Sequence, residues 1–233
     1  MSLDTRQIER DVEAAVAADP ASIAERVRAI TLAALTEGRL DSQALRGVMN
    51  AVLEGAQKGS MPVDATRTAA FKEAMSGLDQ ALASAAQATQ FAIQEAIGRS
   101  AEFSREGLRQ SFEPFSSLEN DLIGALSEAA RKATGEARAT LTELAEHMRH
   151  SGTAAGARVR DAAADLARAS SSLALSQVEG GMKTLLNQAD LLASLAAGVL
   201  RGIADRLNPG NVGAASGAGS DSDPASERKD APH

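Results

Sequence analysis

Apolar residues recur every three or four positions through most of the chain, and polar or turn-forming residues interrupt them. Such spacing places the apolar side chains of each run on one face of an α-helix. The first sixty residues contain three short runs of this kind. Asp4 is expected to cap the first helix, and Pro20 is expected in the first turn of the second. The second and third runs predict a helical hairpin whose buried residues are Val27, Ile30, Val48 and Val52.

Three longer helical patterns follow this region. The first begins at Asp64 and has no strong stop before Glu113-Pro114, which predicts a helix of about 70 Å. The next begins at Ser116-Ser117-Leu118-Glu119, a capping-box sequence, and continues to about His150. A last pattern covers residues 153–207, with Gly180-Gly181 as the expected kink.

Within the long patterns, apolar residues also recur at a spacing of eleven, as in Phe71, Leu82 and Ile93. Eleven residues make three turns at about 3.67 residues per turn, so the apolar stripe stays on one face over a long distance. Such a stripe suits a long bundle, or a helix that lies flat on an apolar surface. Phe91 lies about half a turn away, behind the stripe, where it is either a solitary exposed residue or, as we favour, part of a second apolar contact with Phe103, Phe112 and Phe115. The residues expected to contact a partner or a surface are Phe71, Met75, Leu78, Leu82, Ile93, Ile97, Leu108 and Phe115.

The composition strengthens the helical prediction. Of 233 residues, 50 are Ala and five are Phe, and the chain has no Tyr or Trp. Ala is the strongest helix former, and the aromatic residues that strands favour are scarce, so the fold class is predicted to be all-α. We expect a short-helix region over residues 1–60, long antiparallel amphipathic helices over 61–208, and a disordered tail over 209–233. The tail has no large apolar residue after Val212 and therefore cannot form a core.

Charge and candidate chemistry exclude several classes of function. The formal net charge is −7 and no basic stripe is present, which argues against nucleic-acid binding. The absence of Cys excludes disulfides and thiolate chemistry. His147 and His150 are three residues apart, whereas zinc proteases use a four-residue spacing with an intervening Glu. No G-x-S-x-G sequence occurs. We therefore expect no catalytic, cofactor or metal site, and a protein that is not an enzyme.

The longest uncharged apolar stretch, Leu191 to Leu200, has ten residues, about half of what crosses a bilayer. The first residues lack the apolar run of a secretory signal. The expected location is cytoplasmic, either free or associated with granules.

Several segments resemble a bacterial protein family of unknown function, over about residues 20–207. They are Asp19–Ile30, Gly38–Asp41, Val52–Ala56, Ser151–Gly156 and Leu195–Ala204. This resemblance implies no activity. More loosely, the Ala-rich region 71–115 is similar to phasins, bacterial proteins that coat polyhydroxyalkanoate granules, although phasins lack a separate N-terminal hairpin.

Two functions from different classes remain open, and the resemblance to phasins favours the first. In the first, the long helices coat an apolar granule or a membrane surface, as the resemblance to phasins implies. In the second, the stripes pack on each other in a soluble structural bundle that forms oligomers and binds other proteins. The coat requires a stripe that is loosely packed in the free protein, and the bundle requires one that is already buried.

Overall fold

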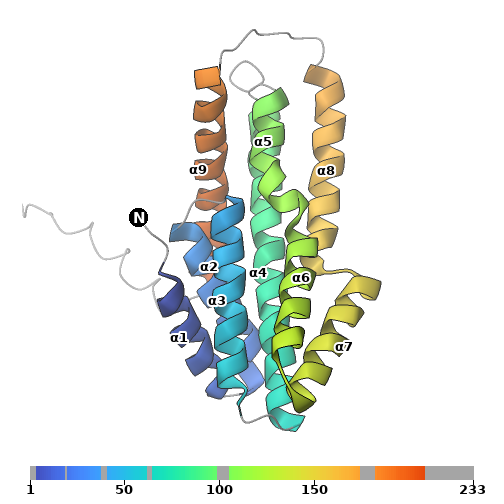
Figure 1. The fold of residues 1–233 in the computed structure, drawn as a ribbon. Helices are drawn as coiled ribbons and strands as arrows, with labels where there is room; N and C mark the ends of the chain where they lie inside the picture. The colour runs from blue at the N-terminus through green and yellow to red at the C-terminus, as the bar shows by residue number, and fades with distance from the viewer. Residues whose placement is uncertain are drawn as a thin grey trace, which may run out of the picture.

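The computed structural model describes residues 4–18, 20–37, 41–61, 65–98, 105–173 and 182–207, and every regular element in these ranges is helical. The predicted all-α class is therefore confirmed (Figure 1). The elements are α1 (Thr5–Ala17), η1 (Pro20–Ser22), α2 (Ile23–Glu37), α3 (Ser42–Gly59), α4 (Ala65–Gly98), α5 (Arg105–Ser116), α6 (Leu118–Lys132), α7 (Gly135–Ser151), α8 (Ala154–Leu173) and α9 (Met182–Leu207). The predicted tail, residues 209–233, lies outside the described residues.

Helix α4 is the centre of the bundle. It packs against α2, α8 and α9, and Figure 1 shows α8 and α9 on opposite sides of it. Many of its buried residues are small, among them Ala74, Ala81, Ala85 and Ala88. A helix with Ala on several sides lets neighbouring helices approach from more than one direction, which explains how α4 can be buried over so much of its circumference.

The N-terminal helices pair differently from the expected hairpin. Helices α2 and α3 touch, but α3 packs mainly against α1, and α2 mainly against α4. Gly55 and Gly59 of α3 explain this choice, because a Cβ at either would overlap the carbonyl oxygen of Glu9 or Glu13 in α1. Of the residues predicted to be buried, Val27, Val48 and Val52 are fully buried and Ile30 is half-buried.

The predicted 70 Å helix is instead two helices. Helix α4 ends at Gly98, and α5 begins at Arg105 and continues past Pro114 to Ser116. A straight helix of that length would leave its second half without partners, whereas α5 packs against α8 and α9. Burial of apolar surface therefore accounts for the division.

The two other long patterns are also divided. Helix α6 ends at Lys132, and α7 begins at Gly135, whose φ of +60° is in the left-handed region. Residues 153–207 form α8 and α9 rather than one kinked helix, and Gly180-Gly181 lies outside the described residues.

One continuous apolar core includes residues from α1 through α9. The predicted regions 1–60 and 61–208 therefore share their interior. Among the described residues, no helix combines the length and the apolar character needed to cross a membrane.

Candidate functional site at the start of helix α8

The predicted contact stripe lies inside the bundle. The side chains of Phe71, Met75, Leu78, Leu82, Ile93 and Phe115 are at most 5% exposed and belong to the common core. Ile97 lies on α4 and Leu108 on α5, and their side chains are outside the described part of the chain. In this closed form the stripe is tightly packed, which differs from the loose packing that a surface coat requires.

Large apolar side chains on the surface come from other positions. Phe91, behind the stripe as expected, is 45% exposed, and Leu191 and Met61 are 52% and 62% exposed. Isolated apolar residues are common on protein surfaces. They therefore do not by themselves define a contact site.

A connected polar cluster surrounds the segment Ser151 to Gly156, where α7 ends and α8 begins. Gly152 has a φ of +75°, a left-handed conformation that glycine adopts readily at the end of a helix. Thr153 follows as the N-cap residue of α8, and its Oγ1 accepts a hydrogen bond of 2.8 Å from the backbone N–H of Gly156. These two residues make the local turn between the helices.

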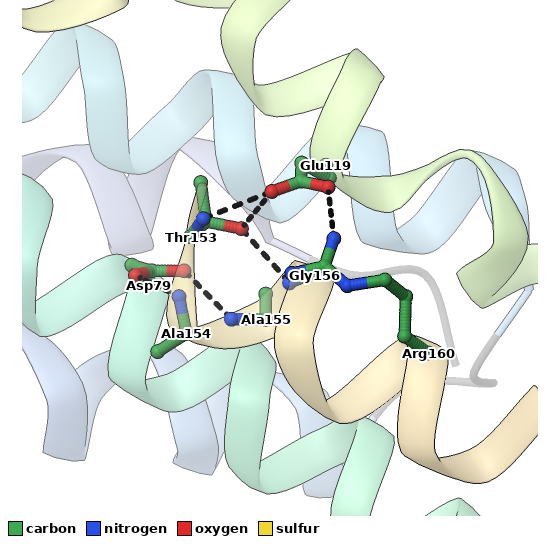
Figure 2. A network of polar contacts seen from close by, with 7 residues as sticks. All are labelled: Asp79, Glu119, Thr153, Ala154, Ala155, Gly156 and Arg160. Atoms are coloured by element: carbon green, nitrogen blue, oxygen red, sulfur yellow. Dashed lines mark hydrogen bonds and ion pairs between the residues drawn. The ribbon is translucent and has the colours of Figure 1, made fainter. Parts of the chain in front are cut away.

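Two carboxylates from other helices complete this helix start (Figure 2). Asp79 of α4 accepts hydrogen bonds from the backbone N–H groups of Ala154 and Ala155, at 2.8 and 3.0 Å. Glu119 of α6 accepts from the N–H and the hydroxyl of Thr153, at 2.9 and 3.1 Å. The first N–H groups of a helix have no partner within the helix and carry partial positive charge, so carboxylates are well suited to bind them.

Glu119 also contacts the next turn of α8. Its second oxygen pairs with Nη1 of Arg160 at 3.1 Å. A Cβ at position 156 would overlap the carboxylate of Glu119, so Gly156 leaves the space that this side chain fills. The segment Ser151–Gly156 therefore combines a turn glycine, a cap threonine and a glycine that admits a carboxylate from a neighbouring helix.

The environment of Asp79 changes its acidity. Burial raises the pKa of this carboxyl and the nearby charge of Glu119 raises it further, while the hydrogen bonds from Ala155 and Ala154 act in the opposite direction. As the pH falls, Asp79 therefore becomes protonated at a higher pH than an ordinary aspartate does.

A second polar contact holds α8 farther along its length. Asp165 accepts hydrogen bonds from the side-chain amides of Gln90 and of Gln94, the latter at 2.8 Å, and it pairs with Arg168. The amide of Gln90 is the largest cause of a lowered pKa at Asp165, followed by the amide of Gln94. Helices α4 and α8 are thus joined by carboxylates at two places.

The apolar contribution of α8 is small by comparison. Among its described side chains, residues 154–168, the fully buried apolar ones are Ala155 and Ala162, whereas Val159 and Leu166 are half-buried. Because Ala buries little area, apolar burial stabilises this helix less than it stabilises a helix with buried Leu or Ile. The carboxylate contacts are therefore a large part of what attaches α8.

The predicted capping box at Ser116-Ser117-Leu118-Glu119 is not formed. Helix α6 begins at Leu118, but the hydroxyl of Ser117 donates to Asp121 at 2.8 Å, and Glu119 binds α8 instead. The backbone N–H and the hydroxyl of Thr153, together with Arg160, compete successfully for this carboxylate. The sequence signal for that partner is the turn-and-cap pattern Gly152-Thr153, which marks a new helix start.

The histidines considered for a metal are on the surface of α7. His147 and His150 are both exposed, and Nδ1 of His150 lies 2.9 Å from the carbonyl oxygen of Glu146. Within the described ranges, no three metal-binding side chains are grouped. The groups assembled around α8 bind backbone N–H groups and each other. They hold the helix in place, and Asp79 can in addition change its protonation state with pH.

Fold and site together define a closed all-α bundle in which half-buried carboxylates of two helices hold the start of a third. The model of a family of unknown function, DUF6781, matches residues 1–209, and the chain belongs to this family. This match confirms the resemblance to a family of unknown function. No curated protein and no solved structure matches the chain. The similarity to phasins remains a prediction.

Proposed function

We propose that this protein is a non-catalytic structural module, a closed helical bundle that acts through its outer surface on copies of itself or on partner proteins. The burial of the stripe residues is the observation that carries the proposal. Their apolar surface is already covered by the protein's own helices, so an external apolar phase is not needed to bury it.

Energetic considerations favour the closed form in solution. Burial of each large side chain such as Leu82 or Ile93 stabilises the fold by about 1.5–3 kcal/mol. A granule or membrane would have to compensate for opening this core before it gained any contact with the stripe. The structural role therefore requires no opening of the bundle, whereas the coat does.

The double variant Leu82→Ser/Ile93→Ser tests the proposal. If the stripe is core, each change removes a buried side chain and together they should lower the free energy of unfolding by roughly 4 kcal/mol or more. Circular dichroism melts would measure this loss. Phe91→Ser on the same helix is the matched control, because its side chain is partly exposed and should change stability much less.

Co-sedimentation of the same proteins with apolar granules completes the experiment. The structural role predicts that the wild-type protein stays in the supernatant. Strong wild-type binding, combined with a double variant that remains folded and loses two to four orders of magnitude in affinity, would instead establish the coat.

A coat that forms after opening of the bundle is the second candidate, and the sparse apolar contact of α8 favours it. Release of α8 would expose the side of α4 that it covers. Hydrogen exchange with and without granules separates the two functions. Loss of amide protection in α8 on granule binding supports the opening coat, and unchanged protection supports the closed module.

A further inference from the structure

A pocket of about 200 Å³ lies at the end of the bundle where α3 ends, α4 begins and α6 meets α7. It is lined by residues of all four helices and is separate from the cluster at α8. Its apolar lining includes Phe71, Ala129, Ala133, Ala137 and Leu141. The larger of these, Phe71 and Leu141, belong to the core, so the floor of the pocket is apolar.

The charged residues of the pocket have one sign. Of the described residues that line it, Arg67 and Lys132 are charged and none is acidic. The whole chain, by contrast, carries a formal charge of −7. Arg67 and Lys132 stand beside the apolar floor, and Glu128, which pairs with Lys132, lies outside the lining, so the charged groups that face the pocket are complementary to an anion with an apolar body.

The two cations differ in how they are held. Nη1 of Arg67 donates to the carbonyl oxygen of Gly59 at 3.1 Å, which fixes the guanidinium beside the end of α3. Lys132 ends α6, its side chain is 76% exposed, and its Nζ is 3.6 Å from Glu128. A lysine with this exposure can turn toward a ligand at little cost. Thr68, Thr140 and Gln57 add hydroxyl and amide groups to the lining.

We propose that this pocket binds a free medium-chain fatty acid, with the carboxylate beside Arg67 and Lys132 and the alkyl chain against Phe71 and Leu141. An apolar cavity of about 150 Å³ accommodates benzene, so a pocket of this size accommodates an alkyl chain of about six to eight carbons. A carboxylate matches the planar guanidinium of Arg in geometry as well as in charge. A two-chain membrane lipid is too large to enter.

Sodium octanoate is the probe, and octylammonium and octanol are the comparison ligands. Titrations of the full chain, followed by amide chemical shifts, should give a dissociation constant of about 1 mM or tighter for octanoate, as expected for a ligand of ten heavy atoms. Octanol should bind at least about fivefold more weakly, and octylammonium at least about tenfold more weakly, because the mouth of the pocket is cationic. Equal affinity for the three ligands, or absence of octanoate binding at about 10 mM, would overturn the proposal.

Two variants localise the site. Ala137→Leu places a larger side chain in the pocket at a half-buried position of α7 and should weaken octanoate binding at least about tenfold. Ala139→Leu is the matched control, an exposed residue of the same helix that does not line the pocket, and it should bind octanoate as the wild type does. Equal binding by Ala137→Leu and the wild type would place octanoate elsewhere and refute the assignment.

Lys132→Gln separates charge from apolar contact. It should weaken octanoate by about threefold to tenfold and leave octanol unchanged, because it removes one exposed cation and no apolar surface. Since the position is exposed at the end of a helix, the variant is expected to fold, and a circular dichroism melt checks this. An unchanged preference of Lys132→Gln for octanoate over octanol would contradict the role of this cation.

Discussion

Three glycines determine how closely helices approach one another. Gly55 and Gly59 of α3 face backbone carbonyls of α1, and Gly77 of α4 faces the carbonyl of Ala24 in α2. A backbone atom, unlike the end of a flexible side chain, cannot rotate away from an added Cβ. At these positions the absence of a side chain sets the distance between two helices.

The variant Gly77→Ala tests this directly. Ala favours helix by about 1 kcal/mol over Gly, but its Cβ would overlap the carbonyl oxygen of Ala24 and displace α2. We expect a net loss of roughly 1–3 kcal/mol in the free energy of unfolding, measured by urea denaturation. The matched control is Gly124→Ala in α6, where no neighbouring helix or side chain lies within 4 Å of the added Cβ, and where stability should rise by up to about 1 kcal/mol. Equal effects of the two changes would contradict the close approach.

At the scale of single elements, α8 is distinctive because carboxylates of two other helices hold its first turn, while its fully buried apolar side chains, among those described, are alanines. Asp79 and Glu119 hold its first turn, and Asp165 holds its middle through Gln90 and Gln94. Helices with few buried apolar contacts tend to open before the rest of a protein. We therefore expect α8 to be the element most sensitive to pH.

The direction of that sensitivity follows from the two pKa shifts. The raised pKa of Asp79 means that its ionised form is relatively unfavourable in the fold, and this penalty disappears as the pH falls through the folded-state pKa toward the unfolded value of about 3.9. The lowered pKa of Asp165 has the opposite consequence. Its stabilising contribution is present above about pH 3.9 and is lost as the pH falls through its folded-state pKa.

Asparagine variants separate the two effects. As the pH falls from about 7 to about 4, the free energy of unfolding of the wild type should rise relative to that of Asp79→Asn. Below about pH 3.9 it should fall relative to that of Asp165→Asn. Urea denaturation at several pH values measures both differences, and hydrogen exchange in α8 shows whether they act on this helix. A difference between wild type and Asp79→Asn that does not vary with pH would exclude the role assigned to Asp79.

At the scale of the whole molecule, the core is continuous from the N-terminal helices to α9. Val52 of α3 and Leu82 of α4 belong to the same cluster, although the sequence suggests a boundary near residue 60. A shared interior couples the stability of both regions. The protein is therefore expected to unfold as one cooperative unit.

Val52→Ala examines this coupling. The side chain is fully buried, so its truncation should lower the free energy of unfolding by roughly 1–3 kcal/mol. The most protected amides of α4 should lose protection by the same free energy as those of α3, although the change is in the N-terminal region. Two separate unfolding transitions, or an effect confined to α1–α3, would instead indicate independent regions.

Local features of the fold could be predicted because their causes lie within a few residues. The periodic apolar residues define the buried faces of the helices, as with Val12, Val27 and Val48. The cap at Asp4 is confirmed by its hydrogen bond from the N–H of Gln7, at 3.1 Å. Phe91 is partly exposed, as its position behind the stripe indicates. Periodicity, and a cap such as Asp4 whose side chain has no competing partner among the described residues, act over one or two turns, and the sequence by itself determines them.

Only the tertiary structure decided which faces meet. The apolar faces of α1, α2 and α3 are chemically alike, and the choice of α1 as the main partner of α3 depends on carbonyl groups that face Gly55 and Gly59. Glu119 could cap its own helix or bind the start of α8, and the distant N–H and hydroxyl of Thr153 prevail. The division between α4 and α5 likewise depends on α8 and α9 as partners. In each case, the outcome depends on which of several contacts between distant segments of the chain is more favourable. A local sequence pattern cannot rank these contacts.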